Sequence, residues 1–187
     1  MKSLKYLIIP FAILVLIGFC EKDDSIIWGT KELEWCDFLA KPDTNQIYSD
    51  ARINTEVRID YSLISYDSIE ITICNLMNKN LSWVKIKDSI GIVHERLHFD
   101  ISELYSRKLR KSIKNLKLNK ISYGKVTKGL YNESMYLLKK QQELYDKEIK
   151  DSTGVNFKFQ KIWCDKIKLE LAKYEEFKSP SIVVKLN

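Results

Sequence analysis

Residues 92–110, IVHERLHFDISELYSRKLR, constrain the fold most, because their apolar side chains recur with the period of an α-helix. These apolar side chains fall on one face of the helical wheel: Val93, Leu97, Ile101 and Leu104. The arginines and Glu103 occupy the opposite face. Asp88 or Ser89 is a suitable N-cap, so the pattern predicts a helix that begins there and ends near Leu116.

The same segment contains both histidines of the chain, in the pattern His94-Glu95-Arg96-Leu97-His98. Chance produces this spacing, with Glu after the first histidine, in roughly one case in a thousand. The wheel turns both imidazoles toward the interior. Residues four apart stand about 5–6 Å apart on one helix face, so both imidazoles can bind one ion, and zinc suits such ligands. The pattern predicts His94 and His98 as zinc ligands and Glu95 as the general base that takes a proton from zinc-bound water.

Two ordinary, partly buried histidines are the alternative interpretation, because short motifs also recur by chance. A catalytic zinc site needs a third protein ligand, and the chain has no third histidine. The third ligand must therefore be a carboxylate, unless the site is incomplete. The candidate acids lie within residues 143–151, ELYDKEIKD.

The first twenty residues have the pattern of a signal peptide. Lys2 and Lys5 precede an apolar run of about thirteen residues, Leu7 to Phe19, which is short for a membrane span. Cys20 follows at the place where a lipoprotein would carry its lipid, although Phe19 is larger than the residue normally found before it. Ordinary cleavage and a retained anchor are the alternatives. We expect residues 1–20 to be a signal peptide of lipoprotein type, Cys20 to be lipidated, and the protein to be exported to the cell envelope and anchored to a membrane surface.

Residues 21–187 are expected to form a single domain. The whole chain has six Gly and three Pro, and nothing in it reads as a linker. Its modest positive charge is of the kind usually spread over solvated helix faces, so no nucleic-acid partner is expected. Cys36, Cys74 and Cys164 match no zinc motif, although export would allow a disulfide between two of them.

The period of the pattern changes from strand to helix along the chain. Apolar and polar residues alternate over much of 53–61 and over 69–74, with a turn at 65–68 between them, which predicts an antiparallel hairpin. Residues 81–84 indicate a further short strand, and residues 182–184 an edge strand. Helices are expected over 123–148 and 155–177. The fold class is therefore α+β, with an antiparallel β-rich N-terminal half, a long active-site helix and two further helices.

The segment HERLHFDISELYSRKLR resembles the core of the domain of unknown function 922 family, whose members are described as predicted secreted zinc-dependent proteases. The likeness extends to further segments: residues 33–38 and 41–43, residues 80–84, residues 141–148, and the helix that holds Gln160 and Trp163. It covers about residues 27–175. The resemblance implies a zincin-like domain that hydrolyses peptide bonds with a metal-activated water.

The chain departs from the family pattern at one position. Family members generally have a histidine after the Tyr-Asp segment, where this chain has Asp151. The resemblance therefore implies Asp151 as the third zinc ligand. It also implies that the strand at 81–84 presents a backbone edge to an extended peptide.

Two functions from different classes follow from these observations. The expected function is that of a zinc-dependent metallopeptidase acting on a peptide or protein substrate. The alternative is a catalytically inactive surface binding module that retains the zincin-like fold, which the missing third histidine would favour. A zinc enzyme that cleaves a non-peptide amide is a weaker third interpretation.

Overall fold

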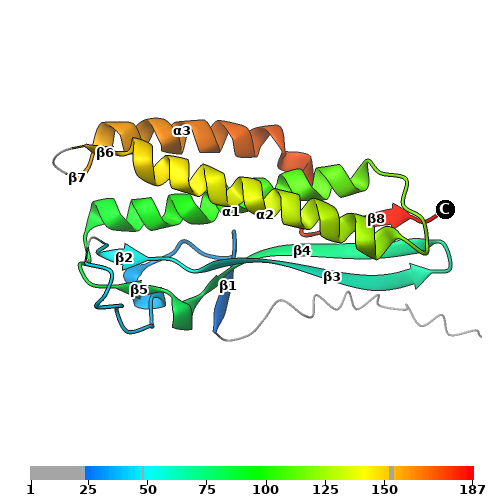
Figure 1. The fold of residues 1–187 in the computed structure, drawn as a ribbon, viewed down its shortest axis with the longest axis horizontal. Coiled ribbons are helices and arrows are strands. Elements are labelled where there is room, and N and C mark those ends of the chain that lie inside the picture. The colour runs from blue at the N-terminus through cyan, green and yellow to red at the C-terminus, as the bar shows by residue number, and fades with distance from the viewer. Residues whose placement is uncertain (1–23, 48, 152–153) are drawn as a thin grey trace, which may run out of the picture.

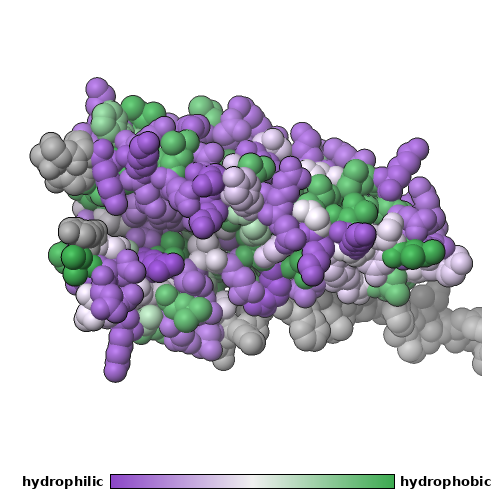
Figure 2. All heavy atoms as spheres, in the orientation of Figure 1, coloured by the Kyte–Doolittle hydropathy of each residue, from purple (hydrophilic) through white to green (hydrophobic). Residues whose placement is uncertain are grey.

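The computed structural model describes residues 24–47, 49–151 and 154–187. Three helices lie over one face of an antiparallel sheet, so the fold is mixed α+β, as predicted (Figure 1). Helix α1 (Ser89–Lys114) packs against the sheet, and helices α2 (Tyr123–Glu148) and α3 (Phe157–Lys173) pack on α1. The molecular face in Figure 2 is mostly hydrophilic, with apolar side chains scattered among the charged ones.

The sheet is built around strand β4 (Ser68–Asn78). Strand β3 (Thr55–Ser65) pairs with β4 along nearly its whole length and forms the predicted hairpin. The other edge of β4 pairs with β1 (Ser25–Ile27) at one end and with β8 (Ser181–Lys185) at the other. All of these pairs are antiparallel, and the prediction of a C-terminal strand is confirmed.

The helix boundaries follow the signals in the sequence. The Asp88 side chain accepts hydrogen bonds from the backbone N–H groups of Ile90 and Gly91, at 2.8 and 2.7 Å, so the predicted N-cap is confirmed. Helix α2 spans the predicted residues. Helix α3 ends at Lys173, four residues earlier than predicted, and a 3₁₀ turn, η3 (Glu175–Phe177), follows it.

Short elements close the end of the molecule near the first turn of α1 (Figure 1). They are η1 (Trp35–Asp37), β2 (Ala51–Arg52), η2 (Lys79–Leu81), β5 (Trp83–Val84), β6 (Lys150–Asp151) and β7 (Gly154–Val155). Strand β5 pairs with β2, and Trp83 also bridges to Ala40. The expectation that residues 81–84 offer an open edge is therefore wrong. The outer edge of β3, by contrast, pairs with no other strand among the described residues.

The predicted signal peptide and its lipidated cysteine, Cys20, lie outside the described residues. Across 24–47, 49–151 and 154–187, none of the helices combines the length and the apolar character that crossing a membrane requires. Cys36 and Cys164 carry free thiols, so a bridge between these two is excluded in this structure.

Candidate metal centre

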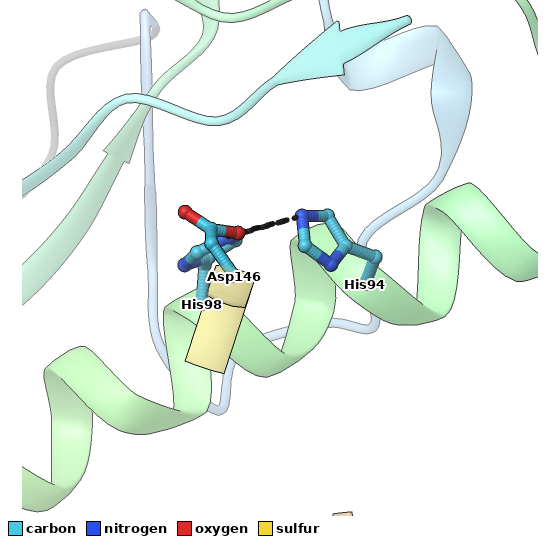
Figure 3. A group of neighbouring side chains, drawn as sticks. All are labelled: His94, His98 and Asp146. Atoms are coloured by element: carbon cyan, nitrogen blue, oxygen red, sulfur yellow. Dashed lines mark hydrogen bonds and ion pairs between the residues drawn. The ribbon is translucent and has the colours of Figure 1, made fainter. Parts of the chain in front are cut away.

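Two helices bring together the three side chains of the candidate metal site (Figure 3). His94 and His98 lie one turn apart near the start of α1, and Asp146 lies near the end of the antiparallel helix α2. His98 Nε2 is 3.1 Å from His94 Nε2 and 3.1 Å from Asp146 Oδ1, and His94 Nε2 is 3.4 Å from the same oxygen. Three ligand atoms thus form a nearly equilateral triangle.

The size of this triangle fits a tetrahedral zinc site. Ligand atoms at about 2.0–2.1 Å from a tetrahedral centre stand roughly 3.3–3.4 Å from one another. The distances between the nitrogens of His94 and His98 and the Asp146 oxygen are 3.1–3.4 Å. Hydrogen bonds explain the triangle less well, because one N–H at His98 Nε2 cannot point at both neighbours with good geometry. A single ion bound by all three atoms would satisfy them.

The charge states of these groups also suit a cation. Burial, with the nearby charge of His98 as a second cause, lowers the pKa of His94 to about 4, so its imidazole is neutral at pH 7. Burial alone would raise the pKa of Asp146, but the hydrogen bond from His98 and the charges of both histidines lower it below its usual value. The cluster therefore offers an ionised carboxylate and a neutral imidazole, as metal binding requires.

Glu95 occupies the next position on α1 and points to the junction of β2 and β3. Its carboxylate Oε2 accepts the backbone N–H of Ile53 at 2.7 Å, and the residue is 3% exposed. Burial raises the pKa of Glu95 to about 7, against the opposing effects of His98 and of the Ile53 hydrogen bond. A carboxyl group with this pKa exchanges protons readily at neutral pH, which is the property of a general base and acid.

Tyr145 supports both imidazoles from α2. Its hydroxyl oxygen lies 3.0 Å from His94 Nδ1, and its fully buried ring stacks on the His94 ring at a centroid distance of 5.0 Å. The same ring meets His98 edge-on at 5.0 Å and packs on Trp163 of α3 at 5.4 Å. Because Tyr145 engages Nδ1, Nε2 is the nitrogen of His94 that faces the other ligand atoms.

The structure thus brings the Nε2 atoms of His94 and His98 together. The Glu95 carboxylate is bound to the Ile53 N–H instead, so its catalytic role stays a prediction. The carboxylate that joins the two histidines is Asp146, one of the acids in the predicted segment 143–151. Asp151, the ligand implied by resemblance, has its backbone in β6, and its side chain lies outside the described part of the chain. Its role stays a prediction. Sequence reasoning missed Tyr145, whose only signal was its place beside Asp146.

A groove of about 450 Å³ runs between β3 and the first half of α2. Tyr131 donates its hydroxyl hydrogen to the Val57 carbonyl at 2.9 Å, so this carbonyl points away from β4 and into the space beside β3. In an antiparallel strand such outward groups recur at every second residue, which adds those of Thr55 and Ile59. Ile53, whose N–H donates to Glu95, precedes the first residue of this strand by two positions.

Comparisons with known proteins add no relative: no family model, no curated protein and no solved structure matches the chain.

Proposed function

We propose that the protein is a zinc-dependent metallopeptidase with a zincin-like fold, related to the domain of unknown function 922 family, exported and lipid-anchored through Cys20. The triangle of His94 Nε2, His98 Nε2 and Asp146 Oδ1, with separations of 3.1–3.4 Å, carries the proposal. Two imidazoles and one carboxylate form the donor set of a catalytic zinc site, which keeps a fourth position for water or substrate.

When bound, zinc would supply Lewis acidity that activates water and polarises the substrate carbonyl. The protein must supply the proton transfers. Glu95 takes a proton from the attacking water as the new C–O bond forms. It then gives that proton to the amine nitrogen as the C–N bond breaks, so it ends each cycle ionised. A pKa of about 7 suits both steps, because neither protonation state is strongly favoured at neutral pH.

The open edge of β3 is the place where we expect an extended peptide to bind. Its outward backbone groups can pair with a substrate strand, and the groove beside it can accept alternate side chains. The Val57 carbonyl already accepts the Tyr131 hydroxyl hydrogen. A substrate must therefore either displace this hydrogen bond or pair with the backbone groups on either side of Val57. Strand β3 begins two residues after Ile53, whose N–H donates to Glu95. A peptide bound along this strand would therefore have its scissile bond near the base.

One observation favours the alternative, a catalytically inactive surface binding module. The Glu95 carboxylate is 3% exposed and already accepts the Ile53 N–H. A buried carboxylate in this position could simply hold the β2–β3 junction against α1. Zinc and Glu95 must therefore be tested separately.

The deciding experiment compares the full chain with its Glu95→Gln variant. The Gln side-chain oxygen still accepts the Ile53 N–H but cannot take a proton, so zinc content should persist. Cleavage of casein and of a fluorogenic peptide library should fall at least about 100-fold. Glu143→Gln, an exposed change on α2, serves as the matched control and should leave turnover unchanged.

Unchanged turnover in the Glu95→Gln variant would refute the catalytic role. Zinc content below about a tenth of an equivalent after reconstitution at neutral pH would instead favour the binding module.

A further inference from the structure

One segment of the chain is strongly basic and contains no acidic residue. Residues 104–132 contain nine Lys and Arg and no Asp or Glu. Arg107 and Arg110 are buried and paired with Glu103. The remaining seven are lysines at positions 108, 111, 114, 117, 120, 125 and 128. They lie on the last turns of α1, the connection to α2 and the first turns of α2, at the opposite end of these helices from His94 and Asp146 (Figure 1).

The same end exposes large apolar side chains. Ile121, in the α1–α2 connection, is 96% exposed, and in the β3–β4 hairpin Tyr66 is 89% and Leu63 71% exposed. Apolar spheres stand among hydrophilic ones at this end of the molecule in Figure 2. Side chains of this size, grouped at the tips of two connections, mark an interaction surface more often than isolated exposed leucines do.

The hairpin and the α1–α2 connection form one surface, because β8 and the C-terminal residues hold them together. The Leu186 N–H donates to the Asp67 carbonyl at 2.7 Å, and the Asn187 N–H donates to the Leu118 carbonyl at 2.8 Å. The Lys120 ammonium also lies 3.3 Å above the centre of the Tyr66 ring. We call this surface, residues 63–67 and 114–128, the basic tip.

We infer that the basic tip docks on the surface of an anionic lipid bilayer. Ile121, Leu63 and Tyr66 can enter the boundary between headgroups and acyl chains, while the lysines around them remain with the anionic headgroups. Asp67 opposes this charge as the single acidic residue within 63–67 and 114–128, but the same residues include five lysines.

Two other partners fit the basic tip less well. A soluble polyanion would neutralise the lysines but leave Ile121 and Leu63 in water. A second copy of the chain would bury those apolar side chains but bring two sets of lysines together. A lipid surface presents anionic groups and an apolar layer at adjacent depths, and so fits both features. Docked in this way, α1 and α2 would extend from the bilayer and carry His94, His98 and Asp146 away from it.

Hydrogen exchange of the full chain on vesicles tests the inference independently of zinc. The chain is reconstituted into vesicles of phosphatidylcholine alone or mixed with phosphatidylglycerol, so any lipid or apolar anchor is common to both. Exchange in residues 63–67 and 114–128 should slow several-fold on the mixed vesicles, and the protection should fall as salt is raised. The exposed face of α3 around Ile162 and Leu169 should not change.

Two variants distinguish docking through the basic tip from general adsorption of the protein to vesicles. Each one removes a large apolar side chain and reverses the charge of lysines near it. Ile121→Ser combined with Lys117→Glu and Lys125→Glu should abolish the added protection. The matched variant Leu169→Ser with Lys161→Glu and Lys168→Glu, also at exposed positions, should keep it. Equal exchange on both vesicle types, or protection that survives the triple change, would overturn the inference. So would protection that depends on protein concentration without vesicles, which would assign the tip to self-association.

Discussion

Helix α1 carries two polar clusters that differ in how their donors and acceptors are used. The first consists of His94 and His98 in its first half together with Asp146 of α2, and the second of Glu103, Arg107 and Arg110 in its second half. The second is buried, whereas the His94 and Asp146 side chains of the first are 17% and 43% exposed. Their comparison separates a cluster that holds the fold together from one that can bind a ligand.

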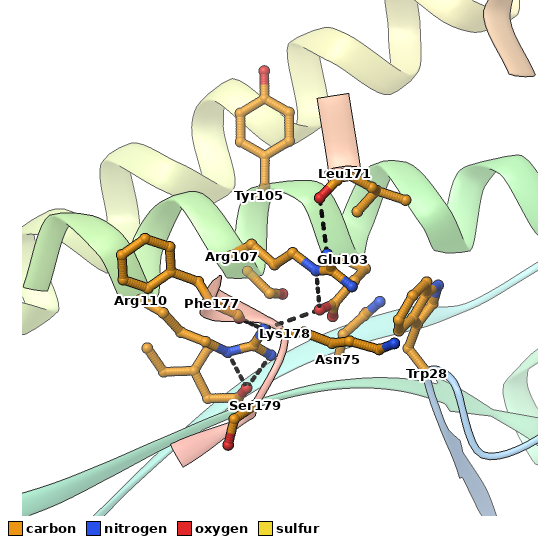
Figure 4. A network of polar contacts seen from close by, with 12 residues as sticks. Trp28, Asn75, Glu103, Tyr105, Arg107, Arg110, Leu171, Phe177, Lys178 and Ser179 are labelled. Atoms are coloured by element: carbon orange, nitrogen blue, oxygen red, sulfur yellow. Dashed lines mark hydrogen bonds and ion pairs between the residues drawn. The ribbon is translucent and has the colours of Figure 1, made fainter. Parts of the chain in front are cut away.

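The second cluster is saturated by its own chain (Figure 4). Glu103 Oε1 accepts from Arg107 Nε at 3.1 Å and from Arg110 Nη1 at 2.9 Å. The remaining donors reach the backbone carbonyl groups of Ile73, Leu171 and Phe177 and the carboxylate of Glu175. The cluster therefore ties α1 to β4, to the end of α3 and to η3.

The first cluster has the opposite arrangement. The facing atoms of His94, His98 and Asp146 converge on one another within 3.1–3.4 Å instead of ending on backbone carbonyl groups. Electron-pair donors gathered in this way gain most from a shared cation. A cluster whose polar groups are all bonded within the chain indicates a structural role. A cluster whose electron-pair donors face one another indicates a binding site for a ligand.

The largest expected effect on stability comes from breaking the saturated cluster. Arg110→Met keeps the aliphatic stem but leaves Glu103 with one partner and the Ile73 and Phe177 carbonyl groups without their donor. We expect a loss of about 3–5 kcal/mol in the free energy of unfolding, measured by urea denaturation. Lys111→Met, at the neighbouring exposed position, should cost less than about 0.5 kcal/mol. A small loss for Arg110→Met would mean that the network is not structural.

The next effect concerns zinc affinity and decides which carboxylate completes the site. Asp146→Ala should weaken zinc binding more than about 100-fold, because removing a ligand should exceed the loss seen for outer-shell groups. Its effect on the apo protein should be small, since the Asp146 side chain is 43% exposed. Asp151→Ala is the matched variant, and competition with a chromophoric chelator measures both. A larger loss for Asp151→Ala would restore Asp151 as the third ligand.

The contrast between Asp146 and Asp151 also shows what the sequence could predict. His94, Glu95 and His98 are related within one helix, so a local period was enough to place them together. Which acid of α2 reaches them depends on how α2 packs along α1, and no local pattern encodes that packing. The wheel placed Arg107 and Arg110 opposite the apolar face, yet they are 1% and 2% exposed, because α1 is covered by the sheet and by two helices.

A smaller loss of zinc affinity is expected for Tyr145→Phe. With His94 Nε2 as the ligand, Nδ1 carries the hydrogen and donates it to the Tyr145 oxygen, which holds the ring in place. Removing the oxygen but keeping the ring should weaken zinc binding about 10-fold, by the same chelator assay. Tyr131→Phe, which removes another bound hydroxyl from α2, should leave the affinity unchanged. Equal affinities for the wild-type protein and Tyr145→Phe would show that the hydroxyl does not position His94.

The smallest effect is expected at the exposed edge of the saturated cluster. Glu175 Oε2 accepts from Arg107 Nη1 at 2.8 Å, but the Glu175 side chain is 61% exposed while that of Arg107 is 1% exposed. Glu175→Gln removes a charge that water and salt already screen, and Arg107 keeps its bonds to Glu103 and to the Leu171 carbonyl. Urea denaturation should therefore show a loss far smaller than that of Arg110→Met, and this loss should shrink as salt is added. A loss as large as that of Arg110→Met would mean that total charge, and not burial, sets the stability of the cluster.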